Sequence, residues 1–158
     1  MSRYSWSSLN HLQLGRYAEY FVKMEFTMLG VDIYSAEVDD HGIDFVARTK
    51  DGKHYDVQVK SVYKSESIYF PKATFTLRKN LLAAIVIFED LKEPRVYLIQ
   101  ATQWLTPHDC FKSYDYIGKE SEKWPEWGLL LSKKYSTTLE SHLFHNVVSA
   151  IIVPEKRA

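Results

Sequence analysis

Residues 42–60, with the sequence GIDFVARTKDGKHYDVQVK, constrain the fold of this chain more than any other stretch. Apolar and polar residues alternate on both sides of Asp51-Gly52, which is the pattern of two half-buried strands. Aspartate followed by glycine is a strong turn signal, because glycine tolerates the left-handed backbone of tight hairpin turns. The stretch therefore predicts an antiparallel hairpin with strands at residues 43–49 and 53–62.

The length of the turn decides which side chains share a face of the hairpin. A two-residue loop would set Asp44 opposite Val59, so that the carboxylate would face the apolar core. A three-residue loop sets Asp44 opposite Gln58 and places Lys60 on the same face. We expect the three-residue loop, because desolvating a carboxylate is costly. Directly opposed side chains lie roughly 5 Å apart at Cβ, so Asp44 and Gln58 can offer oxygens to one cation.

The apolar side of the hairpin is expected to join the core, and its members are Ile43, Phe45, Ala47, Tyr55, Val57 and Val59. The polar side has two interpretations that patterning leaves open. One polar face of an antiparallel sheet is commonly just solvated. An acid, an amide and an amine on neighbouring strands can also be a site for chemistry.

The segment before the hairpin predicts a helix from Ser8 to Leu29. Ser7, Ser8 or Asn10 can cap its start, and Gly30 tolerates the left-handed backbone that ends many helices. Its apolar residues recur at helical spacing and are Leu14, Ala18, Phe21, Val22, Phe26 and Leu29.

Other strands are expected at residues 31–38, 83–90 and 95–101. Further stretches are harder to assign: short strands at 68–70 and 73–77, an irregular aromatic segment at 106–129, and a short helix or strand within 136–153. We therefore predict a single domain, residues 1–158, with an α/β fold in which helices flank a mixed β-sheet.

Composition narrows the class of protein. Twenty Lys and Arg balance twenty Asp and Glu, which argues against a non-specific nucleic-acid coat protein but leaves a local acidic site open. Cys110 is the only cysteine, so an internal disulfide and a thiolate metal cage are excluded. The sequence lacks the apolar runs of a signal peptide or a membrane span, and we expect a soluble, cytoplasmic protein without a membrane partner.

Three spaced elements resemble the PD-(D/E)XK nuclease superfamily, which includes restriction-type, resolvase-type and intron-homing endonucleases. They are GRYAEYFVKMEF with Glu19 on a helix, GID with Asp44 opening a strand, and DVQVKS with Gln58-Val59-Lys60 on the next strand. The resemblance covers residues 11–62 and implies a restriction-endonuclease-like core. Ile43 replaces a frequent proline, and Gln58 stands where the family usually has an acid, as in its Gln-X-Lys members.

The resemblance implies a role for each of these residues. Asp44 is expected to be the central ligand of Mg²⁺, with Mn²⁺ as a substitute, and the carbonyl oxygens of the Gln58 side chain and the Val59 backbone complete the set. Glu19 either binds the metal, directly or through water, or is a surface residue at the helix edge. Lys60 is expected to orient the attacking water or to stabilise charge on the scissile phosphate. Because Gln58 is neutral, Glu19 gains importance as the second carboxylate.

Candidate contacts for nucleic acid lie outside this motif. A basic set close in sequence to Lys60 is expected to guide the substrate, and its members are Lys64, Lys72, Arg78 and Lys79. Asp39, Asp40 and His41 are either outer-sphere groups or an ordinary polar loop. Residues 114–127 mix aromatic rings with charges, as in a nucleic-acid contact, a packed flap or a subunit contact.

Three functions remain open at this stage. The first is a metal-dependent endonuclease acting on DNA, of restriction, homing or resolvase type. The second is a catalytically inactive module on the same fold that binds nucleic acid or protein. The third is an unrelated α/β interaction domain with an amphipathic hairpin. Cutting both strands of DNA implies a homo-oligomer, a dimer or tetramer, because one site cuts one strand.

Overall fold

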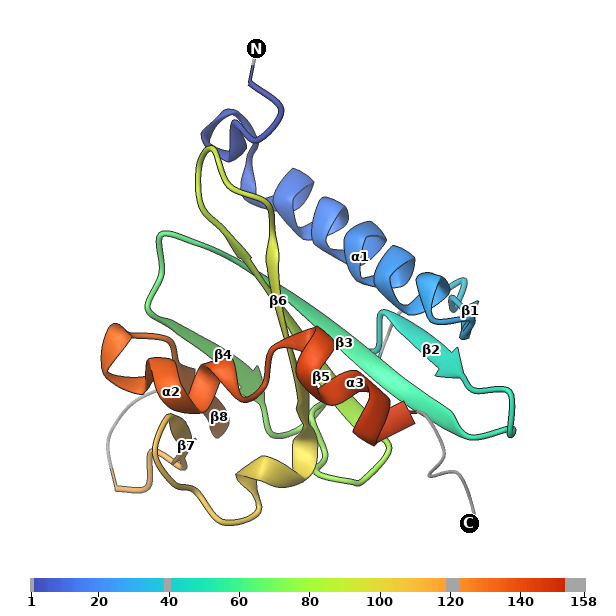
Figure 1. Ribbon diagram of the computed structural model, residues 1–158. Coiled ribbons are helices and arrows are strands. Elements are labelled where there is room, and N and C mark those ends of the chain that lie inside the picture. Colours follow the sequence, from blue (N-terminus) through green and yellow to red (C-terminus); the bar gives the residue numbers. More distant parts are fainter. Residues whose placement is uncertain (1, 39–40, 119–122, 153–158) are drawn as a thin grey trace.

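The computed structural model describes residues 2–38, 41–118 and 123–152 of the chain. Its strands form two sheets (Figure 1). The main sheet has the order β1-β2-β3-β5-β6, with β1 at Asp32–Tyr34, β2 at Phe45–Arg48, β3 at His54–Tyr63, β5 at Leu81–Phe88 and β6 at Arg95–Gln100. The second sheet has the order β4-β8-β7, with β4 at Ser67–Pro71, β7 at Phe111–Tyr114 and β8 at Glu126–Leu130.

Two helices and the second sheet cover opposite faces of the main sheet. Helices α1 (His11–Met28) and α3 (Phe144–Ile152) pack on one face of the main sheet (Figure 1). Helix α2 (Ser136–Glu140), which precedes α3, contributes Leu139 to the core on the other face. Short 3₁₀ turns occur at Trp6–Ser8, Ala101–Trp104 and Lys133–Tyr135. The main sheet is mixed, because β3 and β5 are parallel and its other neighbouring strands pair antiparallel. The predicted fold class is confirmed.

Two hydrophobic cores follow from this layering. Alternate residues of β5 enter each core, with Leu82, Ala84 and Val86 facing the helices and Leu81, Ala83 and Ile85 facing the second sheet. A continuous apolar strand is what burial on both faces requires. Of the two interpretations of the polar side of the hairpin, a fully solvated face does not describe it, because Val62 on that side belongs to the second core.

Local sequence signals place α1 accurately. Asn10 is the cap: its side chain accepts a hydrogen bond from the Gln13 backbone, and the Gln13 side chain accepts one from Asn10 N at 3.0 Å. This reciprocal pair satisfies two amides that the first helical turn leaves open. Gly30 follows the helix with φ of 73°, as its left-handed role predicts.

The hairpin has the expected register. Thr49 N donates to Lys53 O at 2.9 Å, which closes a loop of three residues, and Gly52 has φ of 86°. Ala47 pairs with Tyr55 and Phe45 pairs with Val57. All four of these residues are buried against α1 and α3, as predicted, while Ile43 and Val59 are half-buried.

The second sheet is the main departure from the sequence-based expectations. The segment predicted to be irregular supplies β7 and part of β8, whereas the expected strand at 73–77 is absent from that described segment. The strand expected at 31–38 is limited to β1, and the tail holds two helices. Gly128 permits the pairing of β7 with β8, because a Cβ there would lie 2.6 Å from Tyr114 Cε2.

Candidate active site

Asp44 lies where β2 begins beside β3. Its backbone N–H donates to Val57 O at 2.9 Å, and its carboxylate Oδ2 accepts from Val59 N at 2.6 Å. Regular pairing of β2 with β3 stops at Phe45. Val59 N therefore donates to the Asp44 carboxylate instead of to a backbone carbonyl of β2. A carboxylate offers about four lone-pair sites, so this bond is compatible with simultaneous binding of a cation.

Gln58 is almost fully buried, with 8% of its surface exposed. A Cβ at Gly42 would lie 3.5 Å from Gln58 Nε2 and 3.7 Å from Thr74 Oγ1, so the amide is enclosed by the loop before β2 and the segment after β4. No hydrogen bond of this amide is found within the described residues, although buried amides normally have one. Its carbonyl oxygen therefore has acceptor capacity that a metal ion can use.

Lys60 follows Gln58 on the same side of β3, because successive side chains of a strand alternate. Its ammonium lies 5.6 Å from the centre of the Phe70 ring, and the residue is half-buried. Among the residues that the structure describes, Lys60 has no ion pair. A cation–π contact of this kind is worth about 0.5–1 kcal/mol and leaves the positive charge intact. Within the described residues, the Lys60 ammonium thus keeps its charge without an ion pair, on the same side of β3 as Gln58.

Glu19 approaches from the helical side of the sheet. Gly15, Glu19 and Lys23 form one row on α1, because residues four apart share a helix face. A Cβ at Gly15 would lie 4.0 Å from Ser61 Oγ, and the Lys23 ammonium lies 5.7 Å from the centre of the Phe45 ring. Glu19 therefore lies between these two contacts, over the part of β3 that Asp44 reaches.

The Glu19 carboxylate already has a partner within α1. Arg16 Nη1 lies 2.7 Å from Glu19 Oε2, and 21% of the Glu19 side chain is exposed. The helix covers the face opposite Gln58 and Lys60. Asp44 contacts the Val59 backbone, and Gln58 and Lys60 share one side of β3. Glu19 lies on the helical side of the sheet, and its ion-pair partner among the described residues is Arg16.

The donor set suits a hard cation. Two carboxylates, an amide carbonyl and a backbone carbonyl are oxygen ligands of the kind that Mg²⁺ accepts while keeping several waters. Within residues 2–38, 41–118 and 123–152, no group of three or more His, Cys, Asp or Glu side chains is placed to hold a metal ion. The expected set differs from such a group, because half of its donors are carbonyl oxygens.

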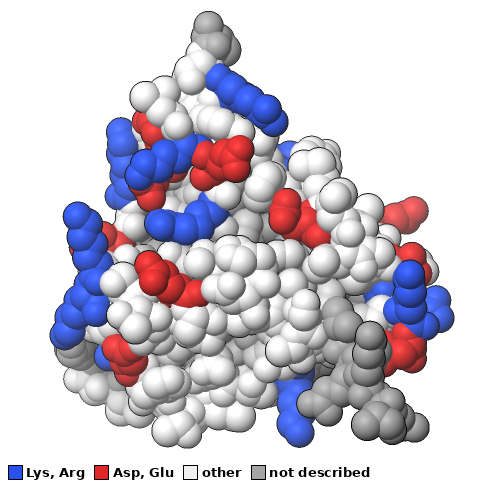
Figure 2. All heavy atoms as spheres, viewed as in Figure 1, with Lys and Arg blue, Asp and Glu red and all other residues white. Residues whose placement is uncertain are grey.

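The four candidate basic residues do not form one track. Arg78 pairs with Asp56 near the start of β3, and Lys64 follows the end of that strand, about 26 Å away at 3.3 Å per residue. Lys72 is engaged by Asp115 at 2.6 Å and lies 4.1 Å from the Trp127 ring centre. On the face shown in Figure 2, basic and acidic groups intermingle around a broad uncharged centre. Lys79 is exposed.

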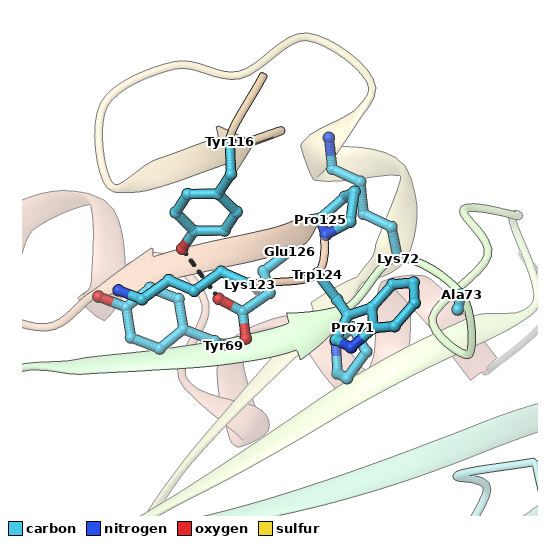
Figure 3. Close-up of a pocket in the computed structure, with 9 residues that line it drawn as sticks. All are labelled: Tyr69, Pro71, Lys72, Ala73, Tyr116, Lys123, Trp124, Pro125 and Glu126. Carbon is cyan, nitrogen blue, oxygen red and sulfur yellow. Dashed lines mark hydrogen bonds between the residues drawn. The ribbon is translucent and has the colours of Figure 1, made fainter. Parts of the chain in front are cut away.

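A cleft of about 680 Å³ lies on the outer side of the second sheet, away from the candidate site (Figure 3). Tyr69, Tyr116 and Trp124 line it, and Tyr116 donates to Glu126 at 3.0 Å. Phe70 points inward, to the Lys60 side, so alternation along β4 directs Tyr69 away from the candidate site. Part of the aromatic segment is a packed flap, since Trp127 Nε1 donates to Phe75 O. Residues 119–122 of that segment lie outside the described residues, as do Asp39 and Asp40.

Three contributors to the site were missed at the sequence level. The spacing of Arg16 and Glu19 is a recognisable ion-pair signal on a helix. Gly42 belongs to the quoted GID element, but the pattern does not show that its backbone has a left-handed φ of 70° or that it lies beside Gln58. Thr74 carries no signal, because only the path of the chain after β4 brings it to Gln58.

The layered mixed sheet with its flanking helices is a nuclease-like α/β fold. Among solved structures it matches a bacterial homing endonuclease, I-Ssp6803I, with a TM-score of 0.53 and 14% sequence identity. The match covers 90% of this chain and 94% of that one. No protein-family model and no curated protein matches the sequence. No helix within the described residues has the length and apolar character to cross a membrane.

Proposed function

We propose that this protein is a metal-dependent endonuclease of the PD-(D/E)XK type that hydrolyses phosphodiester bonds in DNA. The observation that carries the proposal is one set of neighbours: the Asp44 carboxylate on Val59 N, the enclosed Gln58 amide and the Lys60 ammonium, which has no ion pair among the described residues. The fold shared with a homing endonuclease supports it, because such enzymes act on DNA. A local site of this kind is compatible with a net charge of zero.

Each residue contributes to the cleavage of a phosphodiester. Asp44, Gln58 and the Val59 carbonyl would hold Mg²⁺ or Mn²⁺, with Glu19 as a second carboxylate, and the ion would supply positive charge that stabilises the phosphate as it is attacked. The Lys60 ammonium donates to the attacking water or to a non-bridging phosphate oxygen. The Phe70 ring beneath it orients that ammonium without neutralising it.

Two features give the candidate site less negative charge than a site with three acidic side chains would have. Gln58 contributes a neutral oxygen, and Arg16 shares the Glu19 carboxylate. We therefore expect modest metal affinity, with Glu19 recruited when Arg16 moves to a phosphate. The planar guanidinium group can form two parallel hydrogen bonds with either a carboxylate or a phosphate. Arg16 can therefore exchange the Glu19 carboxylate for a phosphate group of the substrate.

Cleavage of supercoiled plasmid DNA with Mg²⁺ tests the proposal. Asp44→Asn and Lys60→Ala should each abolish cleavage, whereas Lys53→Ala, at an exposed lysine of the same hairpin, should not. Calorimetric titration with Mn²⁺ should give a binding isotherm that Asp44→Asn removes. Cleavage at the wild-type rate by either site variant would refute the assigned residues.

A second candidate function is a catalytically inactive DNA-binding module on the same fold. Gln58 in the position usually held by an acid favours it, because loss of that charge weakens the metal site. DNA binding without metal binding or cleavage would establish this alternative. If the protein cuts both strands, sedimentation should reveal a dimer or a tetramer.

A further inference from the structure

The edge of β3 stays unpaired beyond the candidate site. Asp56 N donates to Asn80 O at 2.8 Å, toward β5, so even-numbered amides of β3 face that neighbour. Odd-numbered amides face β2, as Val59 N does when it donates to Asp44. Since β2 pairs no further than Val57, the amides of Ser61 and Tyr63 face an open edge and have no backbone acceptor within the described residues.

A groove of about 320 Å³ runs along this open edge. Ser61, Val62 and Tyr63 of β3 form its floor. One wall consists of residues at the start of α1, namely Leu9, His11 and Leu14. The other wall consists of residues at the start of β4 and just before it, namely Ser65, Ser67 and Ile68. Backbone N–H groups and serine hydroxyls are thus exposed above an apolar base, without a strand to pair them.

Two lysines flank the floor of the groove along β3, although neither lines it. Lys60 directly precedes its floor, and Lys64 directly follows, with its ammonium 4.8 Å from the centre of the Tyr63 ring. The nearby carboxylate of Asp90 is already occupied, because it accepts from Tyr63 Oη at 2.7 Å and from Ser7 N at 2.9 Å. Glu66 lies between Ser65 and Ser67 in the sequence and is exposed, so it adds one negative charge near the groove.

We propose that this groove binds the sugar–phosphate backbone of the DNA strand next to the phosphate that is cut. The inference rests on the proposed nuclease function and extends its site along β3. The amides of Ser61 and Tyr63 are two residues apart, about 6.6 Å along a strand, which is close to the spacing of successive phosphates. An added peptide strand would need a longer run of open edge than these two amides supply.

Amide chemical shifts of the ¹⁵N-labelled full chain test the groove, with the phosphorylated dinucleotide pTpT as the probe. The amide protons of Ser61 and Tyr63 should shift downfield in a saturable manner. The amide of Ile33 is the matched control, because β1 is the outer strand and the register directs Ile33 N–H away from β2. Equal responses of Ile33 and Ser61, or no saturation, would overturn the proposal.

A charge substitution gives an independent measurement. Ser65→Glu should weaken pTpT binding about fivefold or more, as expected for a like charge placed beside a phosphate. Ser149→Glu adds the same charge at an exposed position of α3 and should change affinity less than twofold. Equal effects of the two variants would contradict a phosphate site in this groove.

The outcomes separate this inference from the proposed function. If plasmid cleavage occurs but the Ser61 and Tyr63 amides do not respond to pTpT, the groove assignment alone is wrong. If those amides respond and no cleavage occurs under any metal condition, the groove binds a nucleotide backbone and the catalytic proposal fails. A response to an uncharged extended peptide, with none to pTpT, would show that the edge pairs with protein.

Discussion

Replacing Gln58 with glutamate offers the most informative perturbation of the candidate site. The substitution Gln58→Glu restores the acid typical of the family at a position with only 8% exposure. In the proposed pairing of Asp44 with residue 58, the two Cβ atoms lie about 5 Å apart across the hairpin. At an effective dielectric constant of about 20, two like charges at that distance repel by about 3 kcal/mol.

That repulsion should appear as a pH-dependent loss of stability in the metal-free protein. Burial and Asp44 both raise the pKa of the introduced carboxyl in the folded state. The folded state then binds a proton more tightly than the unfolded state, so the variant matches the wild type at low pH and loses stability as pH rises through the raised pKa. A loss of about 3 kcal/mol lowers Tm by about 6–12 °C for a chain of this size.

Thermal unfolding followed by circular dichroism, with and without Mg²⁺, measures the effect. Mg²⁺ should restore most of the lost stability at neutral pH and should stabilise Gln58→Glu more than the wild type. Gln103→Glu, at a half-buried glutamine outside the site, is the control. The double variant Asp44→Asn with Gln58→Glu should recover most of the lost 3 kcal/mol. A coupling free energy near zero would refute the convergence of these two side chains.

Other expected outcomes test the fold and its chemistry. Gly128→Ala should lower the free energy of unfolding by about 1–3 kcal/mol, because its methyl group would collide with the Tyr114 ring, and denaturant unfolding measures this. Asn10→Ala should cost about 1 kcal/mol in the same assay through loss of the α1 cap, whereas Ser149→Ala should cost almost nothing. Burial raises the pKa of the Cys110 thiol to about 11, so alkylation by iodoacetamide at about pH 8 should be slow in the folded protein and fast after unfolding; rapid labelling of native protein would contradict this burial. Arg16→Ala frees the Glu19 carboxylate and should tighten Mn²⁺ binding in calorimetry, and an unchanged affinity would remove Glu19 from the ligand set.

The site could be predicted where its geometry is local. The pairings of Phe45 with Val57 and of Ala47 with Tyr55 were predicted correctly, because Asp51-Gly52 and the alternation of two adjacent strands determine the register. Because side chains alternate along a strand, the sequence also places Gln58 and Lys60 on the same side of β3. The position of Glu19 was less certain, since a helix can pack on a sheet at several offsets, and the contact of Gly15 with Ser61 decides which one occurs.

The surroundings of Phe70 show most clearly what short sequence patterns cannot predict. Nothing near Lys60 in the sequence indicates that a second sheet will cover the polar side of β3 and place this ring under the ammonium. That sheet joins β4 to β8, more than fifty residues later, and Trp104 Nε1 ties it to Gly128 O at 2.8 Å. Such pairing depends on long-range burial, which alternation within a few residues cannot encode.

Short-range chemistry in the chain was sufficient to specify the capped helix, the hairpin register and the residues that share its polar side, because caps, turns and strand alternation act over a few residues. Tertiary structure alone decided that this side is enclosed rather than wet, that Gln58 is buried beside Gly42 and Thr74, and that the edge of β3 stays open. These features arise where segments distant in sequence meet, since packing free energy is gained only when the whole core assembles.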